Sequence, residues 1–477
     1  MTTEQQLPKG WKKTTLGEIC EIFDSKRVPL NREQREQRIN NKKTDELFPY
    51  YGATGEVGKI DDYIFDGEFV LLGEDAAPFF EPNKNVAYCV KGKFWVNNHA
   101  HILSSSVLEN LYICHYLNQF NFSGYVSGTT RLKLSQGSMK KIPIIYPTSK
   151  ETQQAIVNKI ESLFDEIDEG IGRLKTAAQQ IQQYRQSLLK NAFNGELTKE
   201  WRSKHADTLP SENELLAQIQ TAREQHHAQQ LADWQTAVSQ WEQNGKEGKK
   251  PSKPSSLSSV NILSKDSELP ENWLLTEAES ICDFITKGTT PPKNELFMKS
   301  GEVPFLKVYN LTKNGKLDFT IEPTFVSKET HNNFLNRSKV YPNDILMNIV
   351  GPPLGKVSLV PDDYPEWNIN QAIVIYRSIF VHSKFLANYL LAEKTIKLMS
   401  SQAKTTAGQH NLTLEICRNL PIPVCSLAEQ TQIVAILESK LTACDQVADE
   451  LAKQLKQAEL LKQAVLKAAF SGNLLDK

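Results

Sequence analysis

Apolar residues recur along residues 153–199 at alternating steps of three and four, which is the spacing of a coiled-coil seam. The stripe consists of Ile156, Ile160, Leu163, Ile167, Ile171, Leu174, Ala178, Ile181 and Leu188. The other positions are rich in Lys, Gln and Glu, so a helix here has one apolar face and needs a partner helix to bury it. The pattern predicts a long amphipathic helix that stops at Gly195, a residue suited to a left-handed C-cap.

The same stretch occurs a second time, 277 residues later. Residues 430–476 align with residues 153–199 without a gap, and fifteen of the 47 aligned pairs are identical. The second stripe consists of Ile433, Leu437, Leu441, Cys444, Ala448, Leu451, Leu455, Ala458 and Val465, and it stops at Gly472. The two helices can bury each other's stripe, and antiparallel pairing would relate them by a pseudo-twofold axis. A helix of about 44 residues is about 66 Å long, which sets an upper limit on the distance between the parts at its ends.

Two glycines interrupt the pattern of the first helix. Gly170 and Gly172 each cost about 1 kcal/mol relative to alanine in a helix interior. We therefore expect a bend or a close contact at this point.

Shorter phrases also repeat, ahead of each long helix. The paired phrases are Leu7-Pro8-x-x-Trp11 with Leu269-Pro270-x-x-Trp273, Asn98-His99-Ala100 with Asn370-Gln371-Ala372, and Thr129-Thr130 with Thr405-Thr406. The offset between copies grows from 262 at Leu7 to 278 at Leu134, so the framework repeats while the interior loops differ in length. Short aromatic and β-branched runs separated by glycines, as in residues 48–78, predict hairpins, and residues 108–118 predict a helix. Each module should end in a strand that closes near Pro143 or Pro421.

The pattern predicts an α+β protein with two α/β modules separated by two long antiparallel coiled-coil helices. The expected segments are 1–148 for the first module, 149–200 for the first long helix, 201–262 for a connecting region, 263–425 for the second module and 426–477 for the second long helix. Within the connecting region, residues 211–243 predict a solvated helix with Trp234 and Trp241 as aromatic anchors. Residues 243–259 are low in complexity and predict a flexible linker.

Composition bounds the class of protein. The chain has 477 residues, 40% hydrophobic and 23% charged, which is ordinary for a globular protein. Seven scattered cysteines without a CxxC pair argue against a disulfide framework or a zinc site and favour a reducing compartment. Because neither a signal peptide nor a long apolar run is found, we expect a cytoplasmic protein with no membrane partner. The net charge of −1 gives no basic excess of the kind that DNA-binding proteins usually show.

Each candidate catalytic motif in the sequence lacks at least one residue that its chemistry requires. The phrase at residues 351–356, GPPLGK, has the wrong glycine spacing for a phosphate loop, lacks the Ser or Thr that holds Mg²⁺, and predicts a turn. His99-x-His101 has no third ligand in view, so a metal site is not expected. We expect no catalytic residue in this chain.

Recognition of DNA suits the repeat better than catalysis does. Proteins with twofold symmetry read half-sites separated by a fixed distance on a duplex. Here the two modules are homologous but not identical, so the half-sites should differ and the target should be bipartite and asymmetric.

This layout resembles the specificity subunit of type I restriction-modification systems, over essentially the whole chain. The resemblance rests on the LPxxW openings, the Thr-Thr phrases before an IPIP-like strand, the helix starts near Val157 and Val434, and the helix exit of residues 192–202, AFNGELTKEWR. One departure is that the second exit lacks the Trp-Arg continuation.

The resemblance implies that each module is a target recognition domain and that the long helices are the spacer between them. It further implies double-stranded DNA and two modification (methyltransferase) subunits as partners, with restriction subunits as a further addition. S-adenosylmethionine, ATP and Mg²⁺ would be bound by those partner subunits, and this chain would hold no cofactor and no metal.

Candidate DNA contacts are polar residues on predicted loops, because base edges are read by hydrogen bonds in the grooves while phosphate contacts fix the register. For phosphates we expect the basic loop of residues 26–43, with Lys26, Arg27, Arg32, Arg35 and Arg38. For bases the candidates are Tyr51, Thr54, Glu56, Lys59, Thr129, Thr130 and Arg131 in the first module, and Lys307, Asn310, Asn348, Lys356, Thr405, Thr406, Gln409 and His410 in the second.

Two other functions fit parts of the pattern. A coiled-coil adaptor whose globular ends bind proteins would have the same composition, and would produce no gapped DNA motif. A fused restriction-methylation enzyme is disfavoured by the missing nucleotide and nuclease motifs. The bases read, the length of the gap and the presence of restriction subunits stay open.

Overall fold

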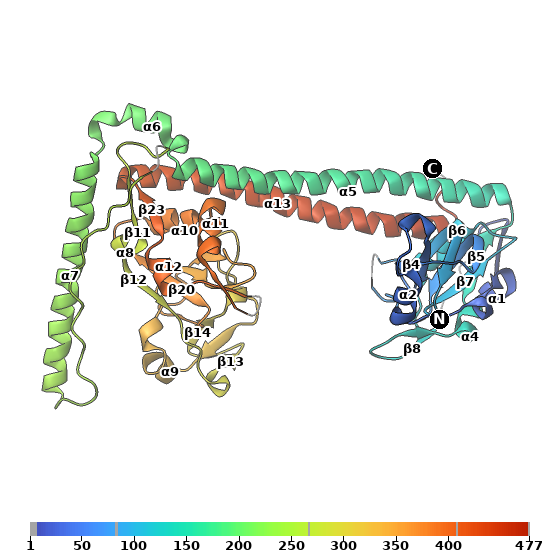
Figure 1. Cartoon of the computed structure of the whole chain (residues 1–477), viewed down its shortest axis with the longest axis horizontal. Helices are drawn as coiled ribbons and strands as arrows, with labels where there is room; N and C mark the ends of the chain where they lie inside the picture. Colours follow the sequence, from blue (N-terminus) through green and yellow to red (C-terminus); the bar gives the residue numbers. More distant parts are fainter. Residues whose placement is uncertain (1–6, 82–83, 266–267, 407–408, 476–477) are drawn as a thin grey trace. The chain divides into compact units, whose positions relative to one another are not determined.

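The structure is a computed structural model that describes residues 7–81, 84–265, 268–406 and 409–475. The chain forms two compact units, Met1–Ala178 with Asp449–Lys477, and Gln179–Ala448. Two long helices, α5 (Lys150–Phe193) and α13 (Leu427–Phe470), each continue from one unit into the other (Figure 1). No helix among the described residues combines the length and apolarity needed to cross a lipid bilayer.

The first unit contains a six-stranded sheet of order β2-β7-β5-β6-β3-β4. Its strands are β2 (Glu21–Ile22), β3 (Phe48–Gly52), β4 (Gly55–Ile60), β5 (Phe65–Gly73), β6 (Ala87–Val96) and β7 (Ala100–Ser104). Alternation along β5 gives the sheet two apolar faces: Val70 and Leu72 pack with helix α3 (Asn110–Gln119), whereas Leu71 packs into an aromatic cluster around Phe94. The predicted hairpins and helix of this module are therefore confirmed.

The remaining elements of the first unit are short and frame the sheet. They are β1 (Trp11–Thr15), α1 (Leu16–Ile19), α2 (Arg32–Ile39), β8 (Val126–Ser127), β9 (Lys133–Leu134), α4 (Gln136–Lys140) and β10 (Pro143–Pro147).

The second unit is built on two four-stranded sheets, β12-β20-β16-β18 and β13-β15-β14-β19. Their strands are β12 (Cys282–Lys287), β13 (Phe297–Met298), β14 (Val303–Leu306), β15 (Thr324–Val326), β16 (Ile345–Asn348), β18 (Val357–Leu359), β19 (Asn368–Ile369) and β20 (Ile373–Ser378). A third, three-stranded sheet joins β17 (Val350–Gly351), β22 (Gln409–Asn411) and β21 (Lys404–Thr406). The unit also holds β11 (Leu274–Glu277), β23 (Pro421–Val424) and helices α6 (Lys199–Lys204), α7 (Glu212–Gln243), α8 (Ala278–Ile281), α9 (Lys328–Asn332), α10 (Ser383–Leu391), α11 (Glu393–Gln402) and α12 (Leu414–Arg418).

The two modules share a framework, as the repeated phrases predict. In the first unit β1 pairs antiparallel with β10, and in the second β11 pairs antiparallel with β23. The next backbone hydrogen bond is also repeated, from Leu16 N to Ile142 O and from Ala278 N to Leu420 O, each 2.9 Å long. The prediction that strands close at Pro143 and Pro421 is wrong, because these prolines begin β10 and β23, where a missing N–H is tolerated.

Pairing of the long helices is antiparallel in each unit. In the first unit Lys462 Nζ lies 2.5 Å from Asp168 Oδ2, and in the second Arg185 NH1 lies 2.6 Å from Asp445 Oδ1. Asp445 occupies the place of Asp168 in the second copy of the helix, and Lys462 occupies the place of Arg185. The residue numbers of each pair add to 630, so the same antiparallel register of the two helices holds in each unit.

The ends of the helices repeat this correspondence. Phe470 packs edge-on against Tyr112 and Tyr116 of α3, and its counterpart Phe193 packs edge-on against Phe385 and Tyr389 of α10. Both long helices thus anchor an aromatic ring on the equivalent helix of the module in that unit.

Glycine ends both long helices, as predicted. Gly195 has φ +83° and Gly472 has φ +82°, and an added Cβ would lie 2.4 Å from Pro270 Cγ or 2.5 Å from Pro8 Cγ. Each exit glycine therefore packs on the opening proline of the module in its own unit. Of the two outcomes expected at Gly170 and Gly172, a bend or a close contact, the close contact is wrong, because an added Cβ would meet nothing within 4 Å.

The connecting region departs from the prediction in one respect. Helix α7 is present, but the segment after it is not a free tether, because it returns along α7 (Figure 1). Trp234 Nε1 donates to Pro251 O at 3.1 Å, Trp241 Nε1 donates to Gly248 O at 3.2 Å, and Arg223 donates to Ser258 O at 2.9 Å. All seven cysteines of the chain are free thiols.

Candidate nucleic-acid interface

A hairpin is attached to the end of a central strand in both modules. In the first unit the segment from β8 to β9 is held to the end of β5, because Leu134 N donates to Glu74 O at 2.6 Å and Ala76 N donates to Leu132 O at 3.0 Å. In the second unit Leu412 N donates to Ile349 O at 2.9 Å, and β22 pairs with β17 after the end of β16. These hairpins contain the Thr-Thr phrases. We call this part of each module, with the Asn-x-Ala turn beside it, the hairpin edge.

The Asn-x-Ala turn joins the hairpin edge through the backbone. Glu74 N donates to His99 O at 2.7 Å in the first unit, and Ile349 N donates to Ala372 O at 2.9 Å in the second. Residues 98–100 and 370–372, which are far from the hairpins in sequence, thus lie at the same edge in both modules.

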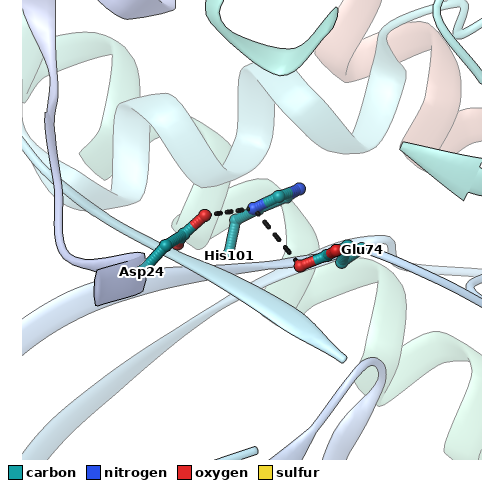
Figure 2. A group of neighbouring side chains, drawn as sticks. All are labelled: Asp24, Glu74 and His101. Atoms are coloured by element: carbon teal, nitrogen blue, oxygen red, sulfur yellow. Dashed lines mark hydrogen bonds and ion pairs between the residues drawn. The ribbon is translucent and has the colours of Figure 1, made fainter. Parts of the chain in front are cut away.

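Below the first hairpin edge lies a buried ion network, shown in Figure 2. His101 is fully buried, its Nδ1 lies 2.6 Å from Asp24 Oδ2, and its Nε2 lies 2.8 Å from Leu134 O. Both ring nitrogens therefore lie against oxygen atoms, which ties the ring to two segments of the module. Burial raises the pKa of Asp24, but the hydrogen bond and charge of His101, with the Ile102 amide and Arg27, outweigh it and lower that pKa overall.

The same group has the composition of a metal site, but its donor atoms are already used. Asp24, Glu74 and His101 each offer one ligand atom within 4.8 Å of the others. Arg27 NH1, however, lies 2.6 Å from Glu74 Oε2 and also donates to Ala100 O at 3.0 Å. A guanidinium inside the cluster supplies the positive charge that a metal ion would bring. We therefore assign the network a structural role, which is to fix the strands beneath the hairpin.

Outward-facing side chains of the first edge are organised by one carboxylate. Asp75 Oδ1 lies 2.6 Å from His99 Nδ1, and Asp75 Oδ2 lies 3.0 Å from Arg131 NH2. The side chains of His99 and Arg131 are 38% and 62% exposed. Thr129 and Thr130 are exposed on the same hairpin, so three predicted base readers lie together.

The second edge carries different groups on the same framework. A cavity of about 440 Å³ is lined by Lys287, Gly288, Thr289, Arg337, Val350 and Gln371. Gln371 takes the place of His99 in the Asn-x-Ala turn, and Val350 follows β16 as Asp75 follows β5. Thr405 and Thr406 lie in β21 opposite His410 and Gln409 of β22, so the backbone of all four predicted readers belongs to this edge. The turn between them, residues 407–408, falls outside the described residues.

Two predicted base readers of the second module are contradicted by burial. Asn310 is 1% exposed and donates to Asp318 O and Ile321 O, and Asn348 is fully buried and donates to Val350 O and Pro353 O. Their amides shape turns of the module and cannot reach a base. Lys356 also turns inward, with Nζ 3.2 Å from Val308 O, and Lys307 lies over the ring of Tyr309.

The predicted basic loop contains a helix, α2, which has Asn31 as its N-cap. Two of its three arginines face the sheet: Arg35 lies over the Tyr50 ring at 4.6 Å, and Arg38 lies 2.7 Å from Asp61 and 5.0 Å from the Trp95 ring. With Arg27 in the buried network, three of the five predicted phosphate contacts hold the fold together. Lys26 and Arg32 remain exposed.

The predicted readers on the β3–β4 hairpin adjoin the Asn-x-Ala turn of the hairpin edge, because Asn97 N donates to Tyr51 O at 3.0 Å. Thr54 is exposed at the turn, and Glu56 pairs with Lys59 at 3.0 Å. Tyr51 packs against Tyr88 and Phe94, and burial followed by the charge of Glu56 raises the pKa of its phenol.

Sequence reasoning did not include His99, Lys287, Arg337 and Gln371 among the candidate DNA contacts, although the structure places them at the two hairpin edges. For His99 and Gln371 a signal existed, since the repeated Asn-x-Ala phrase changes only its middle residue. Lys287 and Arg337 lie in segments with no counterpart phrase in the first module.

Comparison with known proteins identifies the family of this chain. The family described as type I restriction modification DNA specificity domain matches residues 8–175 and residues 270–457. A type I restriction enzyme specificity subunit of Haemophilus influenzae is 34% identical over 155 residues, which cover 32% of this chain and 37% of that protein. The EcoDI specificity subunit of Escherichia coli is 21% identical over 476 residues, which cover 98% of this chain and 90% of that one. A chain from a solved structure of a type I R-M system shares the fold with a TM-score of 0.61 at 16% identity, covering 98% of this chain and 100% of that one. Since the family matches the chain twice, and over most of its length, this protein belongs to the type I restriction-modification specificity family.

Proposed function

We propose that this chain reads a split, asymmetric DNA target, each module reading one half through its hairpin edge. The observation that carries the proposal is the recurrence of one backbone construction with different side chains on it. The first edge presents Asp75, His99 and Arg131, and the second presents Lys287, Arg337 and Gln371. Two modules that read different half-sites need different hydrogen-bond donors and acceptors, and these can be carried on the same backbone.

In this proposal some of the exposed Lys and Arg side chains contact bases and others contact phosphates. Arg131, Lys287 and Arg337 stand at the edges, where guanidinium and ammonium groups donate to guanine O6 and N7 or to phosphates. Lys26 and Arg32 stand outside the first edge and suit phosphate contact, which fixes register without reading sequence.

The helix pair supports the proposal that two modification subunits bind. Tyr184 in the second unit and Leu461 in the first are 47% and 52% exposed, and they occupy the same place in the two copies of the long helix. A pseudo-twofold relation that repeats an exposed apolar position offers two similar surfaces, which suits two copies of one partner. In this proposal those subunits methylate adenine with S-adenosylmethionine, restriction subunits use ATP and Mg²⁺, and the present chain holds neither cofactor nor catalytic residue.

The test is the pattern of methylated adenines in a host that carries this chain with its modification subunits. We expect one split motif with a constant gap, which disappears when the chain is deleted. Replacing hairpin residues 128–131 by a glycine-serine segment should change one half of the motif and leave the other half and the gap intact. A motif unaffected by that replacement would rule out the first hairpin edge as a reader. A methylome without any gapped motif would favour the adaptor function instead.

A further inference from the structure

The geometry points to a reading pair: we propose that Asp75 positions His99 and Arg131 to read adjacent base pairs of one half-site. This inference rests on the proposed function, because it needs the first hairpin edge to face DNA. His99 is a specificity-determining residue in this account, and Asp75 is a positioning residue that does not itself touch the base.

The hydrogen bonds fix which atoms point outward. A carboxylate can only accept, so the 2.6 Å contact between Asp75 Oδ1 and His99 Nδ1 places a hydrogen on Nδ1. In the neutral ring the outward atom Nε2 then carries a lone pair and accepts. Asp75 Oδ2 holds one amino group of Arg131, at 3.0 Å, and leaves the rest of the guanidinium to donate. Among the residues that the structure describes, neither outward group has a further protein partner.

A hydrogen-bond acceptor on His99 beside the donors of the Arg131 guanidinium favours particular bases. In the major groove the amino groups of adenine N6 and cytosine N4 donate, and guanine O6 and N7 accept from arginine. The pair therefore suits an amino-bearing base opposite His99 and a guanine opposite Arg131. Loss of a good base contact lowers discrimination at its position by about tenfold to a hundredfold.

The support beneath the pair makes it rigid. Glu74, the neighbour of Asp75, is fixed by backbone hydrogen bonds to His99 and to Leu134. Two residues after His99, the buried His101 bridges Asp24 and the Leu134 carbonyl. Both sides of the pair are thus tied to the same network, which limits how far the two side chains can drift from a reading position.

The second module lacks this device at the same place. Val350 stands where Asp75 does and has no carboxylate, and Gln371 replaces His99. Gln371 carries its own donor and acceptor and needs no orienting group. The pair is therefore specific to one half-site.

The experiment compares the motif methylated by the full complex carrying His99→Ala, Arg131→Ala or Asp75→Ala. We expect His99→Ala to broaden one position of one half-site and Arg131→Ala to broaden the neighbouring position. Asp75→Ala should broaden both positions, and Asp75→Asn, which keeps one acceptor, should broaden only one. A purely structural role for Asp75 would instead lower methylation of the whole motif together with the melting temperature.

Two controls keep the outcome decisive. His227→Ala on α7 removes the same side chain outside the hairpin edge and should leave the motif as in the wild type. Gln371→Ala should broaden the other half-site only. If His99→Ala and Asp75→Ala leave every position unchanged while replacement of residues 128–131 alters the motif, the reading pair is wrong and the proposed function stands. If that replacement also has no effect, the proposed function itself fails.

Discussion

The two junctions between a long helix and a module are built from the same phrases but held by different forces. In the second unit Glu429, at the start of α13, is fully buried and accepts hydrogen bonds from Arg202 at 2.6 Å, Thr198 at 2.8 Å and Trp273 Nε1 at 3.0 Å. In the first unit Thr152 stands at the place of Glu429, and Trp11, the counterpart of Trp273, is only half-buried.

The comparison separates the contacts that both junctions share from the contacts that strengthen only one of them. In both junctions the exit glycine packs on the opening proline of the module, and the last phenylalanine of the long helix packs on a helix of the module. These two contacts set the path of the chain. Among the described residues the charged clamp is found at the second junction only, so it adds strength to a geometry that does not depend on it. We define the clamp as Glu429 with Arg202, Thr198 and Trp273.

Removing the carboxylate of the clamp should have the largest effect. Glu429→Ala removes a fully buried carboxylate and leaves the half-buried guanidinium of Arg202 without its counter-charge; breaking a buried pair costs about 3 to 5 kcal/mol, which is an upper bound here. We expect loss of protection from hydrogen exchange around β11 and α6, with residues of the first module unaffected. Thr152→Ala is the matched control and should cost less than about 1 kcal/mol. An equal loss at both junctions would show that the clamp is not what distinguishes them.

The exit glycines should respond alike, because they belong to the shared geometry. Gly195→Ala and Gly472→Ala each force a Cβ into a left-handed residue and against a proline ring, at about 1 to 2 kcal/mol or more for the backbone alone. Thermal unfolding of each variant measures this, and similar losses are expected. If only Gly195→Ala were harmful, the junctions would differ in path as well as in strength.

The two ion pairs between the long helices should differ in strength. Arg185 and Asp445 are 11% and 22% exposed, whereas Lys462 and Asp168 are 28% and 59% exposed. A double-mutant cycle should give well under 1 kcal/mol for the exposed pair and more for the other. Lys316 also contacts Asp445, at 3.0 Å, so its variant belongs in the cycle.

Acid should weaken the second pair selectively. Burial raises the pKa of Asp445, but its bonds to Lys316 and Arg185 outweigh this and lower that pKa below the ordinary value of 3.8. A lowered carboxyl pKa means that the stabilisation is complete above about pH 4 and is lost as the pH falls through the folded-state value. Asp445→Asn should remove this part of the acid dependence, as measured by unfolding between about pH 5 and pH 2.

Much of this fold could be predicted because the repeat is long and its period is unambiguous. The seam from Ile156 to Leu188 and its second copy predict two paired helices, and the glycines at their ends mark where they stop. The need of each stripe for a partner predicts the pairing, and the ion pairs of Asp168 and Asp445 confirm the antiparallel direction that we expected.

The site was predicted less well, because burial depends on contacts that are distant in sequence. Asn348 looked like a loop residue, yet its amide closes a turn inside the core. Arg35 and Arg38 looked like solvated charges, but the rings of Tyr50 and Trp95, which lie beneath them, come from strands elsewhere in the chain. Arg131 is exposed on its hairpin, as its prediction required, and its contact with DNA stays a prediction.

The smallest expected effect comes from building half of the clamp into the first junction. Thr152→Glu puts a carboxylate at the place of Glu429, next to the half-buried Trp11, but without an arginine beside it among the described residues. Attraction to the N-terminal end of α5 favours the new charge by about 0.3 to 1 kcal/mol, so a slight stabilisation is expected. Hydrogen exchange around β1, compared with Thr152→Gln, separates the charge from the added length. A gain well above 1 kcal/mol would mean that the indole hydrogen bond, and not the guanidinium of Arg202, carries most of the strength of the clamp in the second unit.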